Sequence, residues 1–263
     1  MSSNRYAAQL YCFSSVTAPD LFEKLGALAK AGYEGIEFCG GFDKSPEELN
    51  VIMKKAGLKL ISWHIGIDRF MPDQFDATVA YLKALDCHSA VVPGLPGHMT
   101  SDAEAWKNTA ALFDQLSLKL KPHGIKLGYH NHWGEFIKYD DGTCPFSVFF
   151  DNTDHDITCQ VDIGHALNGR GMSLDEIFSR YKGRFNSVHL KPYSLSLGAE
   201  DHGKGYQTFV GQDDIPWQNV LKTLKNDGST DWYIVELEYS GEKGPINVLT
   251  DAINYLKNCE KTI

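Results

Sequence analysis

The stretch Ile157-Thr158-Cys159-Gln160-Val161-Asp162-Ile163-Gly164 alternates apolar and polar side chains. One set is Ile157, Cys159, Val161 and Ile163, and the other is Thr158, Gln160 and Asp162. Successive side chains of a β-strand point to opposite faces, so this pattern predicts a strand with one apolar and one polar side. A polar set that ends in a carboxylate suggests that the second face lines a site and does not merely fill a core.

Seven further strand-like stretches occur, and helical stretches separate them. The predicted strands cover residues 7–13, 35–39, 59–65, 90–94, 126–132, 157–163, 185–191 and 232–238. The predicted helices cover residues 18–31, 46–56, 73–86, 101–121, 145–151, 173–181, 216–226 and 245–258. Such alternation is typical of parallel strands covered by helices, and eight units of roughly 33 residues match a (β/α)8 barrel. The sequence therefore predicts an α/β fold, a (β/α)8 TIM barrel that forms a single domain over residues 1–263.

Local signals agree with this division. Ser45 and Ser173 precede acidic first turns, as N-caps do, and Gly32, Gly57 and Gly124 follow predicted helices. An open doubly wound sheet is the competing architecture, but no G-x-G-x-x-G motif follows the first predicted strand. The irregular stretch 192–215 is too long for a plain connection, which predicts a lid or a mobile insertion there.

Six predicted strands carry an ionisable or metal-ligating side chain on the polar face, near the carboxyl end. These side chains are Glu37, His64, His130, His132, Asp162, His189, Lys191, Glu236 and Glu238. The carboxyl ends of barrel strands meet at one mouth, where barrels build their sites. Burying carboxylates and imidazoles together is costly without partners, and a cation removes that cost. The sequence predicts one divalent ion in this pocket, and the ligand types suit Mn²⁺, Mg²⁺, Co²⁺ or Zn²⁺ alike.

The composition of the chain argues against nucleic acids and membranes as binding partners. The chain has 25 Lys and Arg against 34 Asp and Glu, a formal net charge of −9, and no basic run, so we expect no nucleic-acid partner. No apolar segment has the length of a signal peptide or a membrane span, so we expect no membrane association. The six cysteines form no Cys-x-x-Cys pair, which favours reduced thiols and a cytoplasmic protein. Nothing in the sequence decides the oligomeric state, and barrels of this kind often pair as homo-oligomers.

Several motifs, in this order and spacing, resemble the sugar isomerase/epimerase superfamily of xylose-isomerase-like barrels. They are Gly32-Tyr33-Glu34-Gly35-Ile36-Glu37-Phe38, Tyr129-His130-Asn131-His132 with Glu135-Phe136, Val161-Asp162-Ile163-Gly164-His165, Val188-His189-Leu190-Lys191 and Val235-Glu236-Leu237-Glu238. The resemblance covers nearly the whole chain. It implies a TIM barrel that binds a divalent metal ion and acts on a small-molecule sugar substrate.

The resemblance also implies a ligand set. In the superfamily one ion is held by a Glu after strand five, an Asp after strand six, a His after strand seven and a Glu after strand eight. The last three carry over to Asp162, His189 and Glu236. Ketose epimerases have the first Glu where this chain has Gly128, whereas members with a Tyr-His-Asn-His pattern have a Glu just downstream, here Glu135. The implied first ligand is Glu135, with His130 or His132 as the alternatives.

The other polar side chains of the pocket are assigned to the substrate. They are Glu37, His64, His130, His132, His165 and Lys191. In the superfamily the His three residues after the strand-six Asp contacts substrate oxygens, which here is His165. Trp133 could offer a face on which a sugar ring stacks.

The resemblance implies an isomerase or epimerase that moves a proton next to a sugar carbonyl through an enediolate. Glu135 and Glu236 would be the catalytic bases on opposite walls, and Lys191 or His165 would neutralise the developing negative charge. The same groups could expel a leaving group, so a dehydratase or lyase acting on an inosose or a 3-keto-glycoside is the close alternative. A phosphodiesterase like the abasic-site endonucleases and a noncatalytic sugar-binding barrel are the remaining alternatives.

Overall fold

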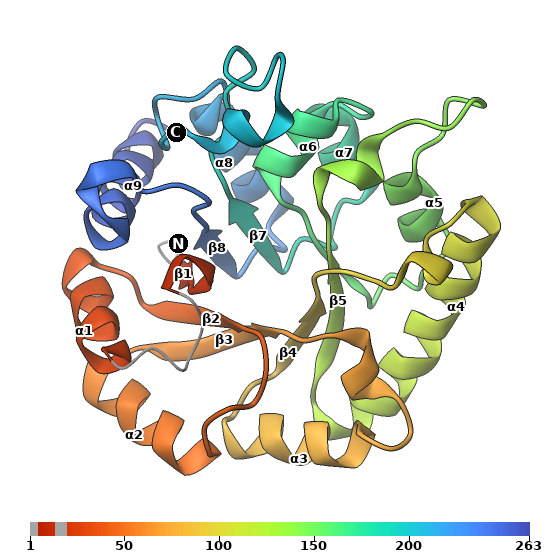
Figure 1. Cartoon of the computed structure of the whole chain (residues 1–263), viewed down its shortest axis with the longest axis horizontal. Helices are drawn as coiled ribbons and strands as arrows, with labels where there is room; N and C mark the ends of the chain where they lie inside the picture. Colours follow the sequence, from red (N-terminus) through yellow and green to blue (C-terminus); the bar gives the residue numbers. More distant parts are fainter. Residues whose placement is uncertain (1–4, 14–19) are drawn as a thin grey trace.

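The computed structural model describes residues 5–13 and 20–263 and is a barrel of parallel strands surrounded by helices (Figure 1). The strands are β1 Arg5–Gln9, β2 Gly35–Cys39, β3 Lys59–His64, β4 Ser89–Val92, β5 Lys126–His130, β6 Thr158–Gln160, β7 Ser187–Leu190 and β8 Trp232–Val235. Every predicted strand is present, which confirms the (β/α)8 barrel. Most strands are shorter than predicted.

The order of the strands is β6-β5-β4-β3-β2-β1-β8-β7. Between β6 and β7 the barrel is closed by a parallel bridge that pairs Asp162 with His189. The backbone N–H of His189 donates to the carbonyl oxygen of Val161 at 2.9 Å. The ring of strands therefore closes at two of the residues predicted to hold a metal ion.

The helices lie outside the strands (Figure 1). They are α1 Leu21–Ala31, α2 Pro46–Ala56, α3 Phe75–Ala84, α4 Ala103–Leu120, α5 Pro145–Asp151, α6 Ile163–Gly169, α7 Leu174–Arg180, α8 Trp217–Asp227 and α9 Pro245–Glu260. Ser45 forms a capping box with Glu48, and Gly32, Gly57 and Gly124 are left-handed, as predicted. The predicted helix at 18–31 starts partly outside the described residues. No helix in the described parts of the chain has the length and apolar character to cross a bilayer.

The apolar core lies between the strands and the helices. The outward ring of Tyr129 on β5 packs against Trp106, Phe113 and Phe149 of α4 and α5, with ring centroids 4.9–6.0 Å apart. The opposite face of the strands buries polar side chains, among them Glu37, Gln160 and His189. The alternation read from the sequence therefore separates an apolar outer layer from a polar interior, and the polar groups are the ones that build the site.

Helix α6 is absent from the sequence prediction. It begins at Ile163 directly after Asp162, whose side chain accepts a hydrogen bond from the backbone N–H of His165. The turn needs Gly164, because a Cβ there would lie 2.6 Å from the carbonyl oxygen of Lys191. The predicted strand 157–163 overlaps α6 only at Ile163, and no element was predicted for the rest of this helix. The long stretch 192–215 contains a 3-10 helix at His202–Tyr206, and the Tyr206 hydroxyl is hydrogen-bonded to His165.

Close packing between the β5–α5 connection and the segment after α6 gives a stability prediction. A Cβ at Gly171 would lie 1.8 Å from the carbonyl oxygen of Phe136, so Gly171→Ala should lower the free energy of unfolding by about 1–3 kcal/mol. Gly26→Ala is the matched control: it lies inside α1 with nothing within 4 Å of the added Cβ, and it should raise stability by about 1 kcal/mol. Urea unfolding measures both. Equal effects of the two substitutions would contradict the packing.

Candidate functional site

A cavity of about 940 Å³ opens at the carboxyl ends of the strands. Its lining includes His64, His130, His132, Glu236 and Glu238. These residues end or follow β3, β5 and β8, as the polar faces of those strands predict. The volume lies in the range of sites for small organic molecules, roughly 300–1,000 Å³.

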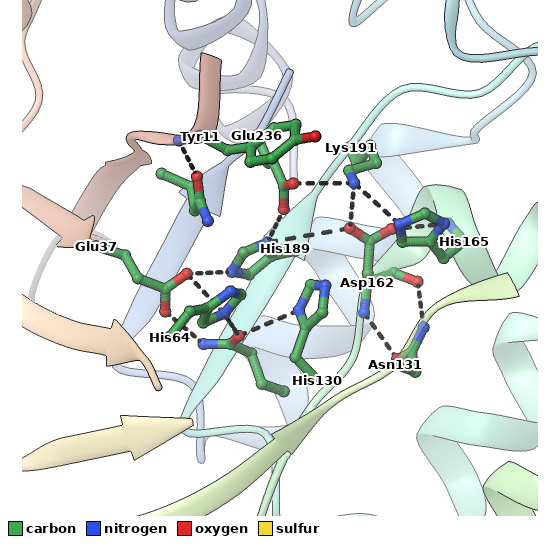
Figure 2. Close-up of polar contacts among 12 residues, drawn as sticks. Tyr11, Glu37, His64, His130, Asn131, Asp162, His165, His189, Lys191 and Glu236 are labelled. Atoms are coloured by element: carbon green, nitrogen blue, oxygen red, sulfur yellow. Dashed lines mark hydrogen bonds and ion pairs between the residues drawn. The ribbon is translucent and has the colours of Figure 1, made fainter. Parts of the chain in front are cut away.

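Four candidate ligands gather at one side of this cavity. His130, Asp162, His189 and Glu236 each offer one donor atom, and these atoms lie within 4.8 Å of one another. Figure 2 shows the four side chains converging from β5, β6, β7 and β8. All four are buried, and two of them are carboxylates. Oxygen and imidazole donors at this spacing are a set that divalent ions bind.

His189 lies at the centre of the group. Its Nδ1 is 2.6 Å from Glu236 Oε2 and 4.0 Å from Asp162 Oδ2, and its Nε2 is 2.7 Å from Glu37 Oε1. Burial alone would lower the pKa of His189, but Glu37 and Glu236 raise it to about 10. Glu37 is fully buried beneath the cluster, where it orients the His189 ring as carboxylate partners of metal-binding histidines do. Glu37 is not among the residues that line the cavity, and its contact with a substrate stays a prediction.

One carboxylate oxygen of Asp162 is hydrogen-bonded and the other is not. Oδ1 accepts the backbone N–H of His165 at 2.7 Å, whereas the buried Oδ2 has no hydrogen-bond partner. Lys191 Nζ is 3.7 Å from Oδ2, beyond hydrogen-bond distance. Burial, reinforced by Glu236, raises the pKa of Asp162 to about 6. An orphaned carboxylate oxygen aimed at three other donors is what a bound cation would satisfy, so the residues fit a divalent ion.

The amide of Gln160 fixes the direction of the neighbouring rings. Its Nε2 donates to Glu37 Oε2 at 2.8 Å and to Ser187 Oγ at 2.9 Å. Oε1 must then accept, from His64 Nε2 at 2.7 Å and from His130 Nδ1 at 3.2 Å. Burial lowers the pKa of His130 well below its ordinary value, so the ring is neutral with its proton on Nδ1. The lone pair of His130 Nε2 is therefore free to bind a metal ion.

Lys191 brings a buried positive charge to the same region. Its Nζ lies 3.0 Å from Glu236 Oε1, 2.9 Å from Glu238 Oε1 and 3.0 Å from His165 Nε2. Burial opposes the charge, but Glu236, Asp162 and Glu238 raise the pKa of Lys191 above its ordinary value. The side chain is an ammonium held beside the candidate ligands.

A chain of hydrogen bonds connects Lys191 to the stretch 192–215. His165 Nε2 accepts from Lys191, so the neutral ring carries its proton on Nδ1 and donates it to the Tyr206 hydroxyl. Asn168 Nδ2 also donates to the Tyr206 hydroxyl, at 2.8 Å. Burial lowers the pKa of His165 well below its ordinary value, which agrees with a neutral ring. Both nitrogens of His165 are thus engaged.

Glu135 lies away from the candidate ligands. Its carboxylate is 2.5 Å from the hydroxyl of Tyr129, which lies on the helix side of β5, and it belongs to none of the ligand groups found among the described residues. Burial raises its pKa despite that hydrogen bond. At Gly128, where the resemblance implies that ketose epimerases have a Glu, an added Cβ would lie 3.0 Å from the Thr158 Cβ and 3.1 Å from its carbonyl oxygen, so a side chain has little room there. In this structure His130, one of the two alternatives, is the fourth member of the cluster in place of Glu135.

The other predicted site residues are close by. His132 lines the cavity with its ring 4.7 Å from that of His165, and His64 stacks on His189 at 5.2 Å. Gln160, Asn168 and Tyr206 were not among the predicted site residues. The polar face of β6 already contained Gln160, whereas nothing in the irregular stretch around Tyr206 marks it.

Metal binding can be tested with two helix-capping aspartates. Asp162→Ala removes a cap and a proposed ligand, so we expect affinity for Mn²⁺ to fall by about 100-fold or more. Asp102→Ala is the control, because Asp102 caps α4 by accepting the Ala105 N–H at 2.9 Å but is exposed and outside every ligand group among the described residues. Calorimetric titration and elemental analysis measure the difference. Equal metal binding by both variants would contradict the site.

Comparisons with known proteins bear on the family and the fold of the chain. An inosose dehydratase from Lacticaseibacillus casei is 24% identical over 268 residues, covering 89% of this chain and 88% of that protein. A sugar phosphate isomerase/epimerase structure from Parabacteroides distasonis has a TM-score of 0.80 at 22% identity, covering 98% and 94%. A D-psicose 3-epimerase structure with D-tagatose, from Clostridium cellulolyticum, has a TM-score of 0.71 at 14% identity, covering 97% and 99%. The family model described as xylose isomerase-like TIM barrel matches residues 25–259, and the chain belongs to that family.

Proposed function

We propose that this protein is a metal-dependent lyase that removes a proton next to the carbonyl of a keto-sugar or keto-cyclitol and expels the oxygen on the following carbon. The observation that carries the proposal is the unpartnered Oδ2 of Asp162 beside His130, His189 and Glu236 at the cavity. The similarity to inosose dehydratases supports a dehydration of this kind.

A divalent ion in this cluster would polarise the substrate carbonyl and stabilise the negative charge that develops on its oxygen. The residues arranged to hold it are His130, Asp162, His189 and Glu236. Glu37 fixes the ring of His189, and Gln160 fixes that of His130. These two contacts keep the donor atoms directed at one point before any ligand binds.

Proton transfer is assigned to the pair Glu236 and Lys191. Lys191 and His189 hold the pKa of Glu236 well below its usual range despite burial, so the carboxylate is ionised, which is the form that a general base requires. The Lys191 ammonium can donate to the departing oxygen. Glu236 Oε1 and Lys191 Nζ are 3.0 Å apart, so the hydrogen and the oxygen would leave from the same face of the substrate.

An isomerase or epimerase is the second candidate. These reactions need an acid that returns the proton to another position or face. The Glu135 carboxylate accepts a hydrogen bond from Tyr129, away from the candidate ligands. His132 lines the cavity and is the candidate for the acid that returns the proton. The products separate the two candidates, since elimination releases water or an alcohol whereas isomerisation leaves the mass unchanged.

Exchange of a substrate proton with solvent deuterium tests the proposed base. On a panel of keto-sugars and keto-cyclitols, we expect metal-dependent deuterium uptake and loss of water in mass spectra. Glu236→Gln should reduce both by about 10²–10⁴-fold. Glu242→Gln, at an exposed carboxylate after β8, should leave both unchanged. Wild-type rates in Glu236→Gln would refute the role of Glu236.

Tyr206 is proposed as a positioning residue. Tyr206→Phe removes the acceptor of the His165 proton and frees the ring that holds Lys191, so kcat should fall by about 10-fold with KM unchanged. Tyr33→Phe is the control, because it also loses a buried hydroxyl hydrogen bond, to the Leu249 carbonyl oxygen at 2.8 Å, outside the cavity. A merely structural role for Tyr206 would give both variants the same loss of stability and no selective change in kcat.

A further inference from the structure

The cavity has negatively charged side chains in its lining and no positively charged ones to balance them. Among the described residues, the lining contains the carboxylates of Glu236 and Glu238 and neither lysine nor arginine. The side chains of Glu236 and Glu238 are 7% and 32% exposed, so Glu238 lies nearer to the solvent. Glu238 Oε1 is 2.9 Å from Lys191 Nζ, whereas no hydrogen bond engages Oε2 within the described parts of the chain. The outer part of the cavity therefore presents a negative charge.

The remaining wall offers no charge that would compensate Glu238. Apart from the imidazoles of His64, His130 and His132, it is made by residues at the ends of β1, β2 and β4, namely Gln9, Tyr11, Cys39, Gly40, Pro93 and Gly94. The sequence of residues 1–4 and 14–19, which lie outside the described ranges, also contains no lysine or arginine. A bound molecule thus meets uncharged groups on this wall and carboxylates on the wall formed after β8.

A divalent ion in the cluster would not reverse the sign of the charge. If the ion replaces the proton on His189 Nδ1, it and the Lys191 ammonium bring three positive charges. The carboxylates of the same region bring four negative charges, and they are Glu37, Asp162, Glu236 and Glu238. Lys191 is 1% exposed and contacts both Glu236 and Glu238, so these carboxylates offset its charge. Carboxylates that line a cavity make its potential negative.

The size of the cavity does not prevent a phosphorylated sugar from entering. Its volume of about 940 Å³ lies near the upper end of the roughly 300–1,000 Å³ found for small-molecule sites. A hexose with a phosphate group has the size of such a ligand. Any discrimination against the phosphate must then come from its charge.

We propose that Glu238 is a specificity-determining residue that excludes phosphorylated sugars, so that the substrate is an uncharged keto-sugar or keto-cyclitol. This inference rests on the proposed function for the site and the reaction, and it adds the charge of the substrate. A phosphate dianion in the outer part of the cavity would lie near the Glu238 carboxylate with no lysine or arginine of the lining to neutralise it. An unpaired like charge of this kind selects against one ligand without improving the contacts of another.

Matched ligands test the charge of the substrate without requiring turnover. The probes are fructose, tagatose, psicose, sorbose and myo-inositol, each with and without one phosphate group. They are titrated calorimetrically at about pH 8, where a phosphate monoester is a dianion, into Mn²⁺-loaded protein freed of excess metal. For at least one pair, we expect the phosphate to bind about 10-fold or more weakly than the uncharged partner. About 0.5 M NaCl should reduce this difference at least threefold, because salt screens charges.

Variants of Glu238 assign the effect to this side chain. Glu238→Gln removes the charge but keeps an oxygen that can accept from Lys191, and it should reduce the ratio of the two affinities at least threefold. Glu238→Lys should reverse the preference, so that the phosphate binds more tightly than its uncharged partner. Glu242→Gln is the matched control, because Glu242 also follows β8 but is exposed and outside the cavity lining, and it should leave the ratio unchanged.

The outcomes separate this inference from the proposed function. Phosphates that bind as tightly as their partners, a difference that salt and Glu238→Gln leave unchanged, or no binding of any uncharged probe would overturn the inference. Metal-dependent turnover of a phosphorylated keto-sugar at the rate of its uncharged partner would overturn the inference alone. Discrimination against the phosphates without turnover of any keto-sugar or keto-cyclitol would contradict only the proposed function.

Discussion

The structure depends on an excess of buried negative charge at the point where the barrel closes. Asp162 and His189 pair across the last gap between strands, and Glu37 and Glu236 flank the His189 ring. Lys191 and a proton on His189 offset part of this charge, yet Asp162 Oδ2 still has no hydrogen-bond donor. A divalent cation that replaces the proton on His189 Nδ1 would add the missing positive charge. The same contacts would then close the fold and create the metal site, so the two cannot be altered independently.

In the polar interior, the donor and the acceptor of most hydrogen bonds can be assigned. Beneath the cluster, Glu37 accepts from His189 and Gln160, and Gln160 in turn accepts from His130. Beside it, Lys191 donates to His165, whose other nitrogen donates to Tyr206. These contacts assign the donating nitrogens of His130, His189 and His165, because Gln160 Oε1 and Glu37 can only accept and Lys191 can only donate. Such a prearranged set binds charge as it develops without reorganising, which is how polar sites stabilise transition states.

Strand alternation predicted most of this arrangement, because it depends only on the sequence period. It predicted the barrel, and it predicted that Asp162, His189 and Glu236 point to its interior. It could not place Glu135, since beyond His130 the chain leaves the strand and turns back toward the helix layer, where Tyr129 binds the carboxylate. Helix α6 was missed because its seven residues are too few to show a helical period. Tyr206 reaches His165 through tertiary folding of an irregular segment, for which no local period exists.

Anomalous diffraction from crystals grown with Mn²⁺ tests the central claim most directly. The account predicts one strong manganese peak about 2.0–2.3 Å from donor atoms of His130, Asp162, His189 and Glu236. It also predicts that His189 Nε2 remains on Glu37 and that Glu135 remains on Tyr129. No peak at the cluster, or a peak ligated by Glu135, would contradict the account.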